Sequence, residues 1–260
     1  METYTKEQLI KALCAIRDRG WIRSERGGND GAVGNTLEDL LGIEENNLPI
    51  PNAAEWELKA QRTNTTSLTT LFHMEPSPTA CKFVPKILLP HYGWAHQKAG
   101  QDYPDNEMSF RQTINAAARS DRGFCVKVDR QQRKVVISFD SKFVDARHKG
   151  WLSSVKKRVS MKELEPQPYW GFDDLFHKVG TKLHNCFFIR AQRKRENGVE
   201  FFHYTDILML KGLSQDKFID AIEGGRIYVD FDARTGHNHG TKFRIHKNLI
   251  PELYQEVKAF

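Results

Sequence analysis

The residues best suited to catalysis lie on a short run that ends at position 59. In Glu55-Trp56-Glu57-Leu58-Lys59, polar and apolar residues alternate, which predicts a strand with one polar face. Glu57 and Lys59, two positions apart, then point to the same side. Such a pair suits phosphodiester hydrolysis, because a carboxylate binds Mg²⁺ and a lysine orients or deprotonates the attacking water.

The pair has little weight alone, since one Glu-x-Lys is expected by chance in a chain of about this length. A surface strand that carries an ion pair explains it equally well. Glu38 is a second candidate, in a predicted helix for which Asn35 and Thr36 offer an N-cap. In the first turn of that helix, Glu38 could serve the site or simply interact with the helix dipole.

The segment before this helix is rich in glycine and begins with Arg23 and Arg26. A nucleotide-binding loop needs G-x-x-x-x-G-K-[ST], but Asn29 stands at the first glycine and Asn35 at the lysine. Nucleotide binding at this loop is therefore excluded. A loop with exposed amides and two arginines could contact a DNA backbone, and a plain turn before a helix explains it as well.

A second group of candidates lies near the C-terminus, on a predicted hairpin crowded with basic and amide side chains. Arginine recognises guanine and asparagine recognises adenine in the major groove, which admits a two-stranded ribbon. A solvated basic hairpin is the alternative, and the His-x-His step has no third metal ligand nearby in sequence. The candidate DNA contacts on this hairpin are Arg234, His237, Asn238, His239, Lys242 and Arg244. Arg62 is a further candidate DNA contact, and Arg190 and Arg193 are expected to meet phosphates more than bases.

Composition agrees with a globular protein that binds a polyanion. The 260 residues include 39% hydrophobic and 28% charged residues, and the formal charge is +6. The sequence has no apolar run of about 18 residues and no signal peptide, so neither a membrane span nor a membrane partner is expected. The four cysteines are isolated, which argues against zinc and disulfides and favours the cytoplasm.

The remaining pattern predicts a mixed α/β fold. Helices are expected near the N-terminus and at 172–183 and 214–223, and a hairpin at 123–129 and 134–140. Strands are expected at 65–72, pairing with 55–59, and at 186–191, 226–231 and 241–245. A basic run covers 142–162, and the two prolines in Glu165-Pro166-Gln167-Pro168 mark the most plausible internal boundary.

Taken in order, several of these motifs resemble those of MvaI/BcnI-type restriction endonucleases, relatives of the mismatch-repair nicking enzyme MutH. The matching segments are Gly34 to Leu41, Asn47-Leu48, Pro51-Asn52, Glu57-Leu58-Lys59, Ser67 to Phe72 and Gly236 to His246. The resemblance spans most of the chain and is densest in 34–76 and 166–246. As an ordered set, these motifs are far more specific than any one of them.

The resemblance implies a two-lobed, MutH-like α/β endonuclease with a PD-(D/E)xK core and a DNA-binding cleft. Residues 1–165 would form mainly the catalytic lobe, and 166–260 mainly the DNA-recognition lobe. Glu57 and Lys59 match the E-x-K pair, Glu38 matches the helical glutamate, and Leu58 would offer its carbonyl to the metal. Asn52 takes the place of the family's metal-binding aspartate, and its amide should hold Mg²⁺ much more weakly.

The expected activity is that of a type II restriction endonuclease. It would cleave double-stranded DNA with Mg²⁺ at a short, CC-x-GG-like site, as a monomer, with a cognate DNA methyltransferase as its functional partner. Asn52 would impair this form, whether the change is introduced or natural. Two alternatives stay open: a MutH-like enzyme that nicks one strand, and a sequence-specific DNA-binding protein that does not cut.

Overall fold

The computed structural model describes residues 4–26, 31–43, 56–63 and 67–260, which form two compact units. Unit 1 comprises Met1–Ser67, Val179–Ser214 and Lys247–Phe260; unit 2 comprises Leu68–Lys178 and Gln215–His246. Each unit is thus built from segments far apart in the chain, and the boundary predicted after residue 165 falls within unit 2. Which unit cleaves and which recognises bases stays a prediction.

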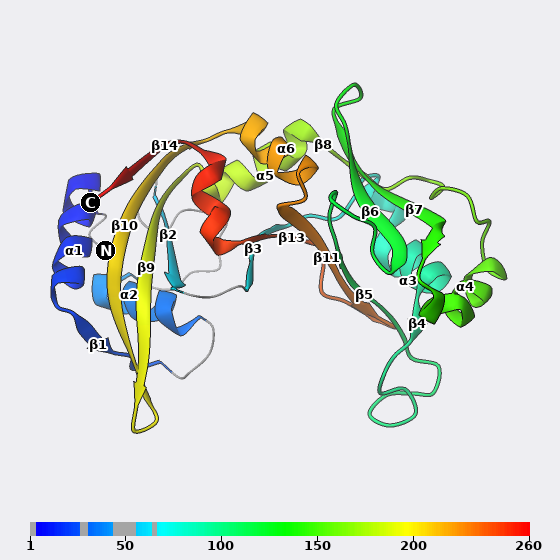
Figure 1. Cartoon of the computed structure of the whole chain (residues 1–260), viewed down its shortest axis with the longest axis horizontal. Coiled ribbons are helices and arrows are strands. Elements are labelled where there is room, and N and C mark those ends of the chain that lie inside the picture. Colours follow the sequence, from blue (N-terminus) through cyan, green and yellow to red (C-terminus); the bar gives the residue numbers. More distant parts are fainter. Residues whose placement is uncertain (1–3, 27–30, 44–55, 64–66) are drawn as a thin grey trace. The chain divides into compact units, whose positions relative to one another are not determined.

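Unit 1 is organised around one sheet with the strand order β1-β10-β9-β2, to which β14 adds by pairing with β10. Its strands are β1 (Trp21–Arg23), β2 (Glu57–Arg62), β9 (Asn185–Glu196), β10 (Val199–Leu213) and β14 (Tyr254–Ala259). The long β9–β10 hairpin turns at Asn197-Gly198 (yellow in Figure 1). Strand β2 pairs with β9 in parallel, which requires a long crossover, and here the chain passes through unit 2 between them.

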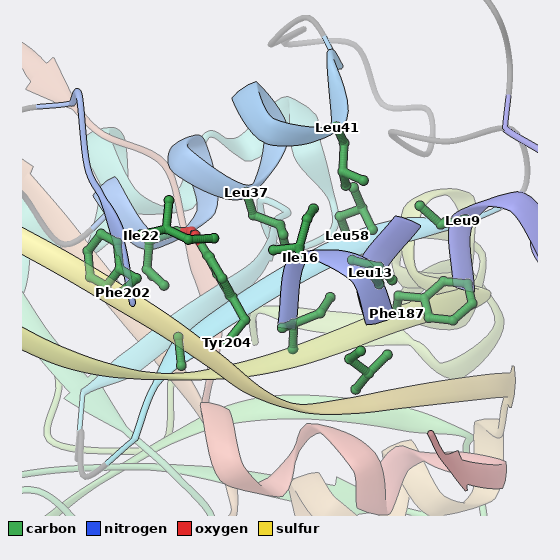
Figure 2. Packing of buried hydrophobic residues seen from close by; sticks show 14 of the residues in the cluster. Leu9, Leu13, Ile16, Ile22, Leu37, Leu41, Leu58, Phe187, Phe202 and Tyr204 are labelled. Atoms are coloured by element: carbon green, nitrogen blue, oxygen red, sulfur yellow. The ribbon is translucent and has the colours of Figure 1, made fainter. Parts of the chain in front are cut away.

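Two helices of unit 1, α1 (Lys6–Asp18) and α2 (Ala32–Leu41), share one apolar core with the sheet. The helix expected near the N-terminus is α1, on which Leu9, Leu13 and Ile16 recur at helical spacing and are buried. Figure 2 shows Leu37 and Leu41 of α2 packed among the same side chains as Leu58 of β2. Full burial of a leucine contributes about 1.5–3 kcal/mol, so this core holds α2 firmly against β2.

The start of α2 differs from the prediction. The helix begins at Ala32 with Gly31 as its N-cap, so Glu38 lies in its second half and not in the first turn. Thr36 does not cap, because its hydroxyl is buried against that of Ser24, 2.9 Å away. Gly42 ends the helix in the left-handed conformation, with φ 64°.

Unit 2 contains a six-stranded sheet with the order β3-β13-β11-β5-β4, with β12 paired to β11, and a three-stranded sheet with the order β6-β7-β8. The first comprises β3 (Leu68–His73), β4 (Trp94–Ala95), β5 (Met108–Ile114), β11 (Ile227–Arg234), β12 (His237–Asn238) and β13 (Lys242–His246). The second comprises β6 (Arg122–Asp129), β7 (Lys134–Val144) and β8 (Tyr169–Gly171).

The expected pairing of the strand at 65–72 with the strand at 55–59 is wrong. Strand β3 pairs with β13, where Phe72 stacks on Phe243 with ring centroids 4.7 Å apart. The two neighbours in sequence therefore belong to different sheets, because aromatic packing in unit 2 holds β3. The predicted hairpin at 123–129 and 134–140 is confirmed as β6 and β7.

The helices predicted at 172–183 and 214–223 are confirmed as α5 (Phe172–Leu183) and α6 (Gln215–Glu223). The other helical segments are short: η1 (Thr79–Cys81), η2 (Val84–Leu88), α3 (Leu89–Tyr92), η3 (Ala146–His148), α4 (Lys149–Lys156) and η4 (Lys247–Leu253). Within the described ranges, none of the helices has the length and apolar character needed to cross a bilayer.

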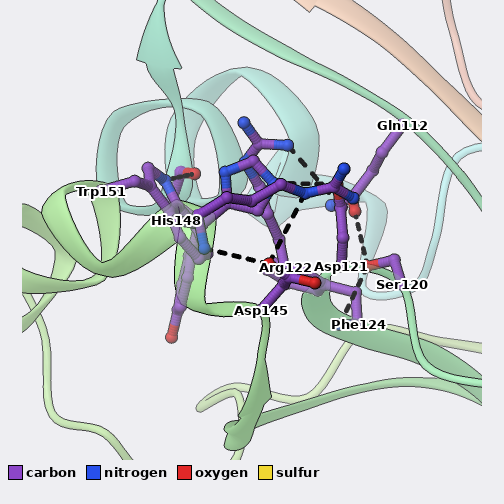
Figure 3. Close-up of polar contacts among 10 residues, drawn as sticks. Gln112, Ser120, Asp121, Arg122, Phe124, Asp145, His148 and Trp151 are labelled. Carbon is purple, nitrogen blue, oxygen red and sulfur yellow. Dashed lines mark hydrogen bonds and ion pairs between the residues drawn. The ribbon is translucent and has the colours of Figure 1, made fainter.

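The basic run at 142–162 is held to Asp121, the residue before β6, by contacts of the kind shown in Figure 3. Asp121 lies 2.8 Å from the Nε2 atom of His148 and 2.8 Å from a guanidinium nitrogen of Arg147. Partial burial opposes ionisation of Asp121, but His148 and the neighbouring arginines outweigh it and lower its pKa. Arg122 adds a cation–π contact, with its guanidinium carbon 3.9 Å from the ring centroid of Trp94.

Candidate catalytic site

Glu57 and Lys59 form a direct ion pair on β2. The Nζ atom of Lys59 donates a hydrogen bond to Oε1 of Glu57 at 2.5 Å. The Glu57 side chain is only 1% exposed, whereas that of Lys59 is 30% exposed. A surface strand with a solvated ion pair therefore does not describe this site. Burying a carboxylate is costly unless it is paired, so the arrangement suggests a chemical purpose.

The two side chains lie on the face of β2 opposite the helices. Leu58 packs into the core with α1 and α2, and neighbouring residues of a strand point to opposite faces. On the Glu57 face, Cys186 of β9 is in register with Glu57 and fully buried. Tyr254 of β14 is buried nearby, and its hydroxyl donates to the carbonyl of Leu183 at 2.7 Å.

The walls behind Glu57 are uncharged. Burial raises the pKa of the Cys186 thiol to about 12, an effect that the positive charge of Lys59 partly opposes. Burial, followed by the effects of Cys186 and Glu57, also raises the pKa of Tyr254 well above its usual value. Both groups therefore stay protonated at neutral pH, and neither adds a negative charge that would compete with Glu57 for Lys59. A protonated thiol is also not a soft metal ligand.

The polar face of β2 continues to Gln61, which the sequence reasoning missed because it ended the strand at Lys59. Gln61 is 4% exposed and is in register with Arg190 of β9. The same alternation that selected Glu57 and Lys59, extended by one more step, would have found it.

Glu38 is half-buried on α2, next to Leu37, which packs in the same core as Leu58. The structure thus places the helix of Glu38 against the strand of Glu57. Asn52 and Glu55, the other acidic or amide candidates, lie outside the described residues. No group of three or more His, Cys, Asp or Glu side chains suited to a metal occurs among the residues that are described.

The chemistry of these donors still fits Mg²⁺, which takes oxygen ligands and keeps several waters. Glu57 supplies a carboxylate, and Leu58 lies beside it with a backbone carbonyl. Glu57 and Leu58 could therefore supply part of a magnesium site, which position 52 would have to complete.

The candidate DNA-contacting arginines of unit 1 differ in the geometry of their ion pairs with neighbouring carboxylates. Arg26 donates two hydrogen bonds to Asp39, at 2.8 and 2.6 Å, and lowers the pKa of that carboxyl. Arg193 is paired with Glu200. Arg23 is 61% exposed and only 3.6 Å from Glu25, the weakest of these pairs in geometry. Arg62 and Arg190 lie at the end of β2 and on β9, and both are half-buried.

The candidate hairpin of unit 2 is formed by β11, β12 and β13, and all six predicted residues lie on it. Three of its cations are held by carboxylates: Arg234 by Glu107 at 3.1 Å, Arg244 by Asp230 at 3.3 Å, and Lys242 by Asp232 at 3.5 Å.

The amide and imidazole groups of the hairpin are also ordered. Asn238 donates to Glu75 at 3.4 Å, and the rings of His237 and His239 are 4.3 Å apart. The cations of this hairpin therefore lie beside carboxylates of the same unit.

Comparison with known proteins agrees with this description. A structure of the restriction endonuclease MvaI in complex with cognate DNA superposes with a TM-score of 0.72 at 26% identity, covering 99% of both chains. MvaI in the absence of DNA gives a TM-score of 0.59 at 25% identity, covering 100% of this chain and 99% of that one. A search of curated proteins found no significant match.

The mixed α/β fold is therefore that of a restriction endonuclease. A sequence model of the MvaI/BcnI restriction endonuclease family matches residues 10–254, and the chain belongs to this family.

Proposed function

We propose that this chain is a type II restriction endonuclease that hydrolyses double-stranded DNA with Mg²⁺. The observation that carries the proposal is the Glu57–Lys59 pair on β2, in which the carboxylate is buried. The chain belongs to a family of restriction endonucleases, for which such a pair is suited. The MvaI structure in complex with its DNA substrate supports DNA as the partner. A short CC-x-GG-like site, a monomeric state and a cognate DNA methyltransferase belong to the same proposal.

Each side chain of the site has a distinct part in the reaction. Glu57 and the carbonyl of Leu58, with position 52, would hold Mg²⁺, which when bound lowers the pKa of water and neutralises charge that builds on the phosphate. The ammonium of Lys59 orients the attacking water and stabilises the developing negative charge. Glu38 would complete the acidic environment from α2. Cys186 and Tyr254, both neutral and buried, keep bulk water away from the rear of Glu57.

Position 52 gives the sharpest test. Asparagine keeps one oxygen at this position but removes a negative charge, so Asn52→Asp should raise Mg²⁺-dependent cleavage of plasmid DNA by orders of magnitude. The matched control is Asn52→Ala, which should be no more active than the present chain. A second control combines Asn52→Asp with Lys59→Met and should lose the gain. An Asn52→Asp variant as inert as the present chain would count heavily against the proposal.

The same plasmid assay separates the two alternatives. A restriction endonuclease converts supercoiled DNA to open circles and then to linear molecules, whereas a MutH-like nicking enzyme stops at the open circle. A protein that only binds would protect its site in a footprint and leave the plasmid supercoiled, even with Asn52→Asp. Sequencing the ends, expected to carry 5′-phosphates and 3′-hydroxyls, would also give the recognition site.

A further inference from the structure

Gln61 has a buried amide oxygen that forms no hydrogen bond within the described part of the chain. Its side chain is 4% exposed, so bulk water does not readily compensate for the missing partner. A buried acceptor that lacks a hydrogen bond destabilises the fold. Such groups are rare in folded proteins, and one on the strand of a catalytic pair calls for a functional explanation.

The alternation of β2 places the side chain of Gln61 on the same face as that of Lys59. Alternate residues of a strand are about 7 Å apart along one face, a span that the long side chains of lysine and glutamine can bridge together. The Lys59 ammonium has three donors, and the hydrogen bond to Glu57 uses one of them. Arg190 is in register with Gln61 on β9, yet it does not satisfy the oxygen.

A divalent cation bound to Glu57 would change which hydrogen-bond acceptors are open to the Lys59 ammonium. With a divalent cation on the carboxylate, the ammonium faces a like charge at short range and its contact with Glu57 is weakened. The ammonium then requires another acceptor on the same face. Among the side chains that β2 places on this face, Gln61 is the next after Lys59. Its Oε1 atom accepts no hydrogen bond from the residues that the structure describes, so it can accept one from Lys59.

We propose that Gln61 is a positioning residue, whose Oε1 accepts a hydrogen bond from the Lys59 ammonium once a divalent cation occupies Glu57. This contact would hold Lys59 at the attacking water instead of letting it swing towards solvent. The inference rests on the proposed function, because it assigns Glu57 to the cation and Lys59 to the water.

Two substitutions at position 61 separate this role from a structural one. Gln61→Leu keeps a similar volume and removes the acceptor, and Gln61→Glu keeps an acceptor oxygen. In the Asn52→Asp chain, Gln61→Leu should lower single-turnover cleavage by about 10–100-fold, as loss of a supporting contact does at metal sites. The DNA dissociation constant measured with Ca²⁺ should stay the same, and Gln61→Glu should retain most of the rate.

The thermal stability of Gln61→Leu should not fall with its cleavage rate. Gln61→Leu removes an unsatisfied polar group, so its melting temperature should equal or exceed that of the parent chain. A residue with a purely structural role would instead show a lower melting temperature and an unchanged cleavage rate. That result would overturn the proposal.

A crystal structure of the full chain with Ca²⁺ tests the contact without any cleavage. The proposal expects Gln61 Oε1 within about 3.2 Å of Lys59 Nζ when Ca²⁺ is on Glu57. A Ca²⁺-bound site with these atoms more than about 4 Å apart would refute it. If Asn52→Asp fails to cut but the contact forms, the proposed function fails and the role of Gln61 in holding Lys59 stands.

Discussion

Replacing Lys59 by methionine should destabilise unit 1 by about 3 kcal/mol at pH 8. Methionine keeps the unbranched aliphatic stem but takes the Lys59 cation away from the buried carboxylate of Glu57. Loss of one partner from a buried pair costs about 3–5 kcal/mol. The lower end applies here because the Lys59 side chain is 30% exposed, so that water already screens part of the interaction.

The converse substitution should cost less. Glu57→Gln removes the buried charge, and the partly exposed ammonium of Lys59 can turn towards solvent. The double variant should recover part of the loss seen with Lys59→Met alone, because neither charge then remains buried and unpaired. For a chain of this size, 3 kcal/mol corresponds to a fall in melting temperature of about 6–12 °C, which thermal denaturation followed by circular dichroism would resolve.

The same variants report on the metal. Millimolar Mg²⁺ should stabilise Lys59→Met more than the parent chain, because a bound cation replaces the lost positive charge. Glu57→Gln should show no such stabilisation. A Lys59→Met variant as stable as the parent chain in the absence of metal would refute the reasoning, since it would mean that Glu57 does not depend on Lys59 for its charge.

Two further outcomes are expected away from this pair. If Arg234 or Arg244 reads bases, its alanine variant should lose discrimination between cognate and random duplexes, measured by competition binding, whereas equal weakening on both would identify a phosphate contact; Glu107→Gln serves as a control for loss of the ion pair of Arg234. Because Arg26 lowers the pKa of Asp39, their pairing stabilises the fold above the unfolded pKa of about 3.9 and ceases as the pH falls through the lower folded value. Both side chains are over 40% exposed, so Arg26→Ala should cost less than about 1 kcal/mol at pH 7 and nothing near pH 2; a larger loss at pH 2 than at pH 7 would contradict the assignment.

The sequence was sufficient to place Glu57 and Lys59 beside each other, but it did not predict their surroundings. Alternation along β2 correctly placed Glu57 and Lys59 on one face, because side-chain direction in a strand is a local property. The burial of Glu57 is not local. It arises from the parallel partner β9, more than a hundred residues away, and from Tyr254 near the end of the chain. The residues near Glu57 in sequence do not predict its contact with β9 or with Tyr254.

The errors have a similar physical origin. Asn35 and Thr36 are good N-cap residues, but the buried contact between Thr36 and Ser24 places them inside α2. The strand expected at 65–72 forms as β3, Leu68–His73. Its pairing with β13 is stabilised by the stacking of Phe72 on Phe243, a long-range contact that strand propensity does not predict. Local signals thus gave the element types, and tertiary packing decided a boundary and a pairing.

Charge balance explains why position 52 matters more than any other residue of the proposed site. The charges of Glu57 and Lys59 cancel, so the pair alone offers little attraction for a divalent cation beyond a single carboxylate that is already engaged. Affinity for such cations rises with the number of charged oxygen ligands. Restoring aspartate at position 52 would give the pair a net negative charge, and the cation could bind without displacing Lys59 completely. The ammonium could then remain on this face, with Gln61 as its second acceptor, where the attacking water must be held.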